Sequence, residues 1–208
     1  IPPGEGVPPV PGRTELPDPL DGPVRDHVVS EVPLPRVILA YRIPPFSHET
    51  FPAADVIRGI LGTGRASRLY RRLVRERRLA KDVVAYAFPL LTGASMLLVW
   101  ATGYPGASLE ELERVVADEV ADLADVSAEE AERAVALMET DLVRRVERVG
   151  ERADLLSMFE LYFGEPERLN REVERLRAVT PERIRDFADA RLQPRHRAVV
   201  AYEPAEAT

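Results

Sequence analysis

Two stretches near the start of the chain have the hydrophobic and polar pattern of β-strands. They are VRDHVVSEVP, residues 24–33, and PRVILAYRIP, residues 35–44, and both are rich in β-branched residues and bounded by prolines. Residues 81–90 and 94–102 have the same character and flank the short connection LTG, which predicts a β-hairpin. The last segment, HRAVVAYEP, predicts one further strand.

Other stretches repeat their apolar residues with the period of an α-helix. Residues 50–61 bring Ala54, Ile57 and Ile60 to one face, which predicts a helix. Gly62 follows directly and is expected to end this helix by adopting the left-handed conformation, which glycine reaches without steric cost.

Capping motifs predict the starts of the later helices. SLEE and SAEE, residues 108–111 and 127–130, each begin with a serine and end with a glutamate, so the two side chains can cap each other's orphan amide groups. Gly150 is expected to interrupt the helix that follows SAEE. A later helix is expected to stop before Gly164, and TPERIRDFADARL opens with a threonine cap and a proline at the first helical position.

The order of these elements predicts the fold class. Paired strands first, helices later and a returning strand are typical of an α+β domain in which an antiparallel β-sheet has helices packed on one face. Residues 1–23 are dense in proline and glycine, which neither pair in a sheet nor sustain a helix. They are interpreted as a linker that leads into a domain of residues 24–208.

Composition narrows the classes of site that the chain can build. The 208 residues carry a net charge of −7 and no cysteine, which excludes thiolate zinc sites, disulfides and a cysteine nucleophile but leaves the redox compartment open. No apolar run approaches the roughly 18 residues that a membrane-spanning helix needs. The localisation is therefore unknown, and a soluble bacterial-type protein of the cytoplasm or periplasm fits this composition.

The stretch LGTGRASRLYRRLVRERRLAKDV, residues 61–83, is unusually rich in arginine for an acidic chain. It lacks the Lys-Ser/Thr pair of a phosphate-binding loop and follows a predicted helix rather than a strand. Arginines recur at helical spacing on one side, opposite an apolar stripe, and they are Arg68, Arg71, Arg72 and Arg75. We interpret the segment as an amphipathic helix whose arginines pair with acidic neighbours. Contact with an acidic partner and nucleic-acid binding are the alternatives.

The sequence contains no recognisable catalytic or metal-binding constellation. Its only histidines, His27, His48 and His196, are far apart, and neither HExxH nor the inverted HxxEH motif occurs. No serine stands in a GxSxG turn, so a Ser/His/Asp triad is not supported either. We therefore predict no catalytic residue and no metal ligand in this chain.

A family resemblance adds to this interpretation. Residues 55–86, DVIRGILGTGRASRLYRRLVRERRLAKDVVAY, resemble a segment of the pitrilysin/insulinase-type zinc metallopeptidases, which include the mitochondrial processing peptidases. The order of hairpin, helices and closing strand continues the likeness from about Val24 to Pro204, and the proline-rich start resembles the connector between the homologous halves of such enzymes. The resemblance implies the processing-peptidase-like half-molecule as the fold.

The resemblance also implies a division of labour. In this family one half carries HxxEH and zinc, and a second half of similar fold closes against it to form a chamber for peptides. This chain resembles the second, inactive half, so the resemblance implies zinc only in a partner half, on the same chain or a separate subunit, and a peptide as substrate. Alone, the chain is expected to be inactive. A structural or adaptor protein of the same fold is the alternative.

The resemblance also directs attention to two residues. The arginine and tyrosine that family members often use to hold substrate align with Val74 and Lys81, so that pair is missing here. Arg75 and Lys81 are the remaining candidates for substrate contact. The short GTG, residues 62–64, corresponds to a glycine-rich substrate loop of the processing peptidases, but we interpret it as a helix terminator and connector.

Overall fold

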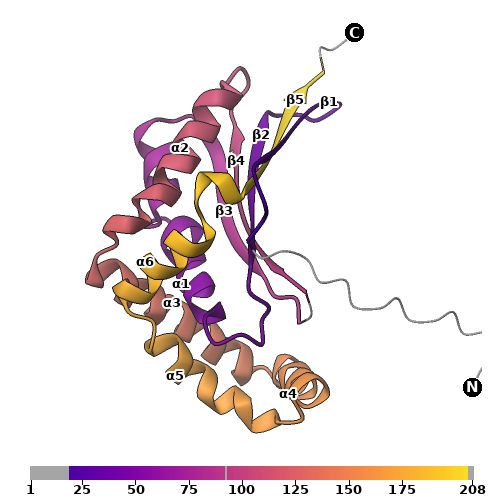
Figure 1. Ribbon diagram of the computed structural model, residues 1–208, viewed down its shortest axis with the longest axis vertical. Coiled ribbons are helices and arrows are strands. Elements are labelled where there is room, and N and C mark those ends of the chain that lie inside the picture. Colours follow the sequence, from indigo (N-terminus) through magenta and orange to yellow (C-terminus); the bar gives the residue numbers. More distant parts are fainter. Residues whose placement is uncertain (1–18, 92, 206–208) are drawn as a thin grey trace, which may run out of the picture.

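A computed structural model describes residues 19–91 and 93–205 of the protein. Its centre is one five-stranded sheet, shown edge-on in Figure 1. The strands are β1 (Val24–Ser30), β2 (Arg36–Ile43), β3 (Ala80–Phe88), β4 (Ser95–Gly103) and β5 (Arg197–Pro204). Their spatial order is β1-β5-β2-β4-β3, so β5, the last strand in sequence, lies between the first two.

Most pairings in the sheet are antiparallel. β2 pairs with both β4 and β5 in this sense, and β3 and β4 form the predicted hairpin. The hairpin is confirmed, although Thr92 in its connection lies outside the described residues. β1 is the exception because it runs parallel to β5, with Val24 opposite Ala198 and Ser30 opposite Pro204. The predicted α+β class is confirmed, with a parallel pair at one edge.

Helices occupy the rest of the described chain, and all of them lie on the same side of the sheet or beyond its end (Figure 1). The α-helices are α1 (Phe51–Gly62), α2 (Leu109–Ala121), α3 (Ala128–Glu147), α4 (Val149–Phe163), α5 (Glu172–Arg177) and α6 (Pro181–Arg191). A π-helical segment, η1 (Tyr70–Glu76), follows α1. Short 3₁₀ segments are η2 (Asp122–Asp125), η3 (Pro166–Arg171) and η4 (Pro194–His196). No helix formed by the described residues is long and apolar enough to cross a bilayer.

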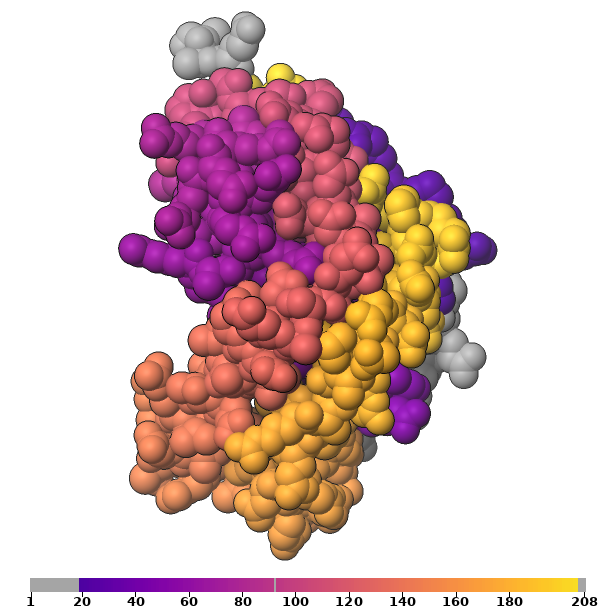
Figure 2. Space-filling model, turned by 90° about the vertical axis from the view of Figure 1, so that its left-hand side faces the viewer, coloured from indigo at the N-terminus to yellow at the C-terminus, as the bar shows by residue number. Residues whose placement is uncertain are grey.

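The hydrophobic core lies between the sheet and this helical layer. Alternate residues of β2 are buried, with Val37, Leu39, Tyr41 and Ile43 at 0–2% exposure, because successive side chains of a strand point to opposite faces. α1 packs centrally, against β3 on one side and α3 on the other. Figure 2 shows the outer surface of the helical layer, with the yellow C-terminal segments crossing it diagonally.

A second, smaller cluster extends the core beyond the end of the sheet. It consists of Leu155 and Phe159 from α4 together with Leu169 from η3. Phe46, from the loop before α1, joins it with a ring-centroid distance of 6.3 Å to Phe159. This cluster holds α4 and η3 together at the lower end of the molecule (Figure 1).

The predicted helix caps are largely confirmed. Ser127 and Glu130 form the complete reciprocal capping box at the start of α3. Ser108 accepts a hydrogen bond from the Glu111 amide at 3.1 Å, but the Glu111 side chain contacts Arg77 instead of closing the box. Thr180 caps α6 by accepting from the Arg183 amide at 3.4 Å.

Of the predicted helix ends, the one at Gly164 is confirmed. The interruption predicted at Gly150 occurs instead at Arg148, and the conformation predicted for Gly62 is wrong. α4 ends at Phe163, directly before Gly164 as predicted, and the φ of 65° at Gly164 is left-handed. The break between α3 and α4 falls at Arg148, two residues before Gly150. Gly62, however, is the last residue of α1 and does not have a positive φ. A Cβ atom at Gly62 would lie 2.3 Å from the Ala85 amide nitrogen, so glycine is needed there for close approach of α1 to β3.

The predicted linker lies mostly outside the description. Of residues 1–23, the structure describes only the last few, and Leu20 accepts a hydrogen bond from the ring of His196 at 2.9 Å. The assignment of residues 1–23 as a linker therefore stays a prediction.

Candidate functional site

The two residues predicted to contact substrate lie on either side of the turn between η1 and β3. Arg75 is near the end of η1 and Lys81 is the second residue of β3, and both are exposed. The pairing of β3 with β4 shifts between Ala80 and Asp82, so Lys81 lies at a β-bulge, a feature that redirects side chains. Neither side chain forms an ion pair or hydrogen bond with another described residue. Both charges therefore face solvent.

The backbone that joins these residues is irregular. The Arg77 amide donates to the Arg72 carbonyl at 3.1 Å, a bond that spans five residues and defines a π turn. Arg78 has a φ of 54°, which a residue with a side chain rarely adopts. The Leu79 amide donates to Leu73 at 2.9 Å and fixes the turn against η1. Because π turns and such outliers concentrate at functional sites, this segment is a candidate for substrate contact.

Ion pairs explain most of the arginine-rich stretch. Arg68 is 7% exposed and donates from Nε and Nη2 to the two oxygens of Glu130, each at 2.8 Å. Arg72 lies 3.1 Å from Glu76 and 3.7 Å from Glu119. The interpretation that the arginines pair with acidic neighbours is confirmed for Arg68, Arg71 and Arg72 but not for Arg75.

The predicted face of the arginine helix is wrong at one position. Helical spacing predicts Arg68 on a solvated side together with Arg71, Arg72 and Arg75. In the structure the Arg68 side chain is instead buried against α3. The π turns of η1 add residues per turn, so the arginine row is not the straight stripe of an α-helix. The bond to Arg68, with help from the Ser127 cap, lowers the pKa of Glu130 to about 2.

The face of the sheet opposite the helices is largely apolar, although Arg42 of β2 also lies on it, opposite Met96. Its central rows are formed by side chains that alternate with the core residues, and these are Ile38, Ala40, Val84, Tyr86, Phe88, Met96, Leu98, Trp100, Ala198, Val200 and Tyr202. We call this set the open face. Most of its members are half-buried, while Tyr86 and Phe88 on the edge strand β3 are 41% and 42% exposed. No helix of the described chain covers it (Figure 1).

A polar line borders the open face at one end. Arg36 donates from Nε to the Thr102 hydroxyl at 3.1 Å, and that hydroxyl donates to Asp82 at 3.0 Å. The three residues occupy neighbouring positions on β2, β4 and β3. Each polar group is thus satisfied where the apolar surface ends.

The histidines are separated in space as well as in sequence. His27 lies 2.9 Å from Glu203, His48 contacts Thr50 at 2.9 Å, and His196 bonds to Leu20. Among residues 19–91 and 93–205, no three His, Asp or Glu side chains are grouped closely enough to hold a metal ion. The described part of this chain therefore offers no ligand set for a zinc ion, which the family resemblance assigns to the other half.

Sequence reasoning missed the open face. The signal was present in LLVW, residues 97–100, because a strand whose apolar residues do not alternate with polar ones has both faces suited to burial. The Arg36, Thr102 and Asp82 line could not have been found from the sequence, since it depends on the register between three strands.

Comparison with known proteins places this architecture in a family. A sequence profile described as the peptidase M16 inactive domain matches residues 1–138. A zinc protease named PqqE from Helicobacter pylori is 32% identical over 80 residues, which cover 38% of this chain and 18% of that protein.

Solved structures share the fold. A protease from Helicobacter pylori has a TM-score of 0.85 at 22% identity, covering 97% of this chain and 48% of that one. A peptidase M16 inactive domain from Pseudomonas fluorescens has a TM-score of 0.75 at 17% identity, covering 96% of this chain and 48% of that one. The chain thus spans about half the length of these two solved chains.

Proposed function

The chain belongs to the peptidase M16 inactive domain family, and from that premise we propose that it forms the chamber wall of a zinc metallopeptidase, opposite a half that carries HxxEH. In this proposal the metal, its activated water and the glutamate base belong to the other half, because the described histidines of this chain are too far apart to build such a centre. This half contributes shape and contact with the peptide.

The observation that carries the proposal is the open face. Soluble proteins rarely leave a large contiguous apolar surface to water, and such a surface marks contact with another molecule. Here it spans the central strands β2, β4 and β5, while the helices cover the opposite side. A second half that closes over this face would shield Trp100 and Leu98 and enclose a peptide between the two halves.

Arg75 and Lys81 are the proposed contacts to the peptide. Their positive charges are free of partners in the described chain, and long cationic side chains can donate hydrogen bonds to peptide carbonyls or to acidic side chains. The β-bulge at Lys81 and the irregular turn at Arg78 hold both residues on one short segment.

Reconstitution tests the proposal. The HxxEH-bearing half, identified in the coding sequence upstream or in a neighbouring gene, is expressed with and without this chain and assayed with an unstructured fluorogenic peptide. We expect hydrolysis only when both halves are present and none from this chain alone. Hydrolysis or stoichiometric zinc binding by this chain alone would overturn the proposal. Association without hydrolysis, or no HxxEH half in either place, would favour the structural or adaptor alternative.

A further inference from the structure

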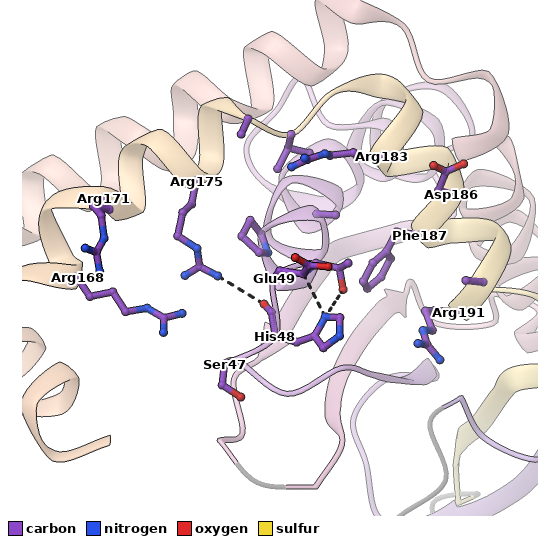
Figure 3. Close-up of a pocket in the computed structure, with 16 residues that line it drawn as sticks. Ser47, His48, Glu49, Arg168, Arg171, Arg175, Arg183, Asp186, Phe187 and Arg191 are labelled. Atoms are coloured by element: carbon purple, nitrogen blue, oxygen red, sulfur yellow. Dashed lines mark hydrogen bonds between the residues drawn. The ribbon is translucent and has the colours of Figure 1, made fainter. Parts of the chain in front are cut away.

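A groove on the helical side of the molecule concentrates positive charge (Figure 3). It has a volume of about 680 Å³ and lies between the loop before α1 and the segments η3, α5 and α6. Five of its lining residues are arginines and two are carboxylates, although the whole chain has a net charge of −7. The arginines are Arg168, Arg171, Arg175, Arg183 and Arg191. Because helices cover this side, the groove is separate from the open face.

Three of the arginines form a row. Arg168, Arg171 and Arg175 are spaced by three and four residues along η3 and α5, so their side chains leave the same side of the helical ribbon (Figure 3). The rise of about 2.0 Å per residue in a 3₁₀-helix and about 1.5 Å in an α-helix separates neighbouring members by about 6 Å.

Neighbouring acidic and aromatic side chains hold the arginine row in place. One oxygen of Glu172 accepts from Arg168 Nε at 3.3 Å and from Arg175 Nη1 at 2.7 Å, so a single carboxylate serves two guanidinium groups. The Arg168 guanidinium also lies 3.9 Å from the centre of the Phe163 ring. Arg171 in turn lies 2.6 Å from Glu165. Two carboxylates therefore serve three guanidinium groups, and the row keeps a net positive charge.

The opposite wall of the groove adds a fourth cation. Arg183, on α6, forms no side-chain ion pair with a described residue. Between the arginines the floor is apolar, with Pro52, Ala53 and Phe187. Glu49 and Asp186 also line the groove, but the five arginines outnumber them. A cleft in which one charge sign predominates attracts ligands of the opposite sign.

We propose that this groove binds an extended peptide segment with acidic side chains at alternate positions. In an extended chain, side chains on one face repeat every two residues, about 6.7 Å apart, which is close to the spacing of the arginine row. Each carboxylate can then meet one guanidinium, the pairing with the best geometric match. The row is about 12 Å long, which a single phosphate ion cannot span. The proposal is independent of the chamber-wall function because it uses neither the open face nor a catalytic half.

Peptide binding tests this inference on the 208-residue chain. Fluorescence anisotropy measures the affinity of two labelled peptides of the same composition. In one peptide three aspartates alternate with valines, and in the other the aspartates are adjacent. The measurements are made at about 10 mM ionic strength, where the Debye length is about 30 Å. Added salt then screens the attraction between the peptide carboxylates and the arginines. We expect the alternating peptide to bind about tenfold more tightly and to be released by salt.

Variants locate the site. The double substitution Arg171→Gln and Arg183→Gln removes two exposed guanidinium groups, and each lost charged hydrogen bond is expected to weaken binding about tenfold. Arg114→Gln, an exposed arginine on α2 outside the groove, is the matched control and should leave affinity unchanged. Circular dichroism checks that the variants fold. If the variants do not fold, the relative affinity of the unmodified chain for the two peptides decides whether the groove prefers alternating carboxylates.

Other results would overturn the inference. They are the absence of peptide binding at low salt, equal affinity for the two peptides, and equal loss of binding in the control variant. Pyrophosphate is tested as a competitor, and binding of pyrophosphate without binding of the alternating peptide would also end the proposal, since it would assign the groove to a small anion.

Discussion

Arg68 and Glu130 form a bidentate ion pair that joins the start of the η1 segment to the first turn of α3, with both N···O distances at 2.8 Å. Glu130 also accepts from the Ser127 amide at 3.3 Å, so one carboxylate closes a helix cap and holds the arginine-rich segment. The segment that carries Arg75 is therefore anchored to the helical layer at one buried point.

Removing the carboxylate should be costly. Glu130→Gln removes the hydrogen-bonded counter-charge of the buried Arg68 guanidinium and leaves only the more distant Glu119 and Asp122. We therefore expect the free energy of unfolding to fall by about 3 kcal/mol. Urea denaturation measures this loss. Glu129→Gln, on the exposed side of the same turn, is the control and should change stability by less than about 0.5 kcal/mol. Equal effects of the two substitutions would show that the ion pair does not anchor the segment.

The same pair makes stability depend on pH in the acid range. The pKa of Glu130 falls from its ordinary value of 4.5 to about 2 in the folded protein, chiefly through the bond to Arg68. The folded state therefore gains stability from the ionised carboxylate above about pH 4.5 and loses it as the pH falls through 2. We expect the difference in unfolding free energy between the wild type and Glu130→Gln to shrink over that window. A constant difference from pH 6 to pH 2 would contradict this assignment.

A methyl group at Gly62 should disrupt the contact between α1 and β3. The added Cβ in Gly62→Ala would lie 2.3 Å from the Ala85 amide nitrogen, so the helix must shift, at a cost of about 1–3 kcal/mol. Gly150→Ala is the comparison, because nothing lies within 4 Å of its Cβ position in α4. We expect that substitution to be neutral or stabilising by up to about 1 kcal/mol. Thermal unfolding of both variants checks the contrast, which would be absent if Gly62 only served as a flexible terminator.

A charge on the open face should interfere with assembly more than with folding. Leu98 is half-buried there, and Leu98→Glu places a carboxylate where the proposed second half must exclude water. We expect association with the HxxEH-bearing half, measured by sedimentation, to weaken at least about tenfold. Leu137→Glu on α3, where the leucine is 41% exposed on the helical side, should leave association unchanged. If both variants assemble like the wild type, the halves meet elsewhere.

Neutral substitutions at the two proposed contact residues should affect substrate binding alone. In the assembled peptidase, Arg75→Gln and Lys81→Gln are each expected to raise KM about fivefold with little change in kcat, because an exposed charged hydrogen bond contributes about 1 kcal/mol. Stability should not change, since neither side chain has a partner in the described chain. Unchanged KM values in both variants would remove these residues from the substrate surface.

Local patterns in the sequence were sufficient for most of the architecture. The capping serine at Ser127, the end of α4 before Gly164 and the β3–β4 hairpin follow from short-range chemistry, and each forms as predicted. The local pattern around Gly62 predicts a helix terminator with a positive φ. That prediction is wrong because glycine is needed there for the close approach of Ala85, a residue distant in sequence that the local pattern does not reveal. The burial of Arg68 was missed for the same reason, since its partner Glu130 lies on another helix.

The groove shows a different limit of sequence reasoning. Arg168, Arg171 and Arg175 already stand at helical spacing in the sequence, so a row of cations could have been predicted. Their convergence with Arg183 across a cavity could not, because it depends on how α5 and α6 fold back against the loop before α1. The proposed peptide groove is therefore formed by the tertiary arrangement of these arginines and not by a sequence motif.

The parallel pairing of β1 with β5 constrains how the protein can be made. As the chain leaves the ribosome, β1 emerges among the first described segments, yet the strand that should hydrogen-bond to it is the last to be translated. In the folded sheet β1 does not pair with β2, because β5 lies between them. The nascent domain must therefore keep one strand edge unsatisfied until synthesis of β5 is complete, and a stop codon before Arg197 would deprive β1 of its partner permanently.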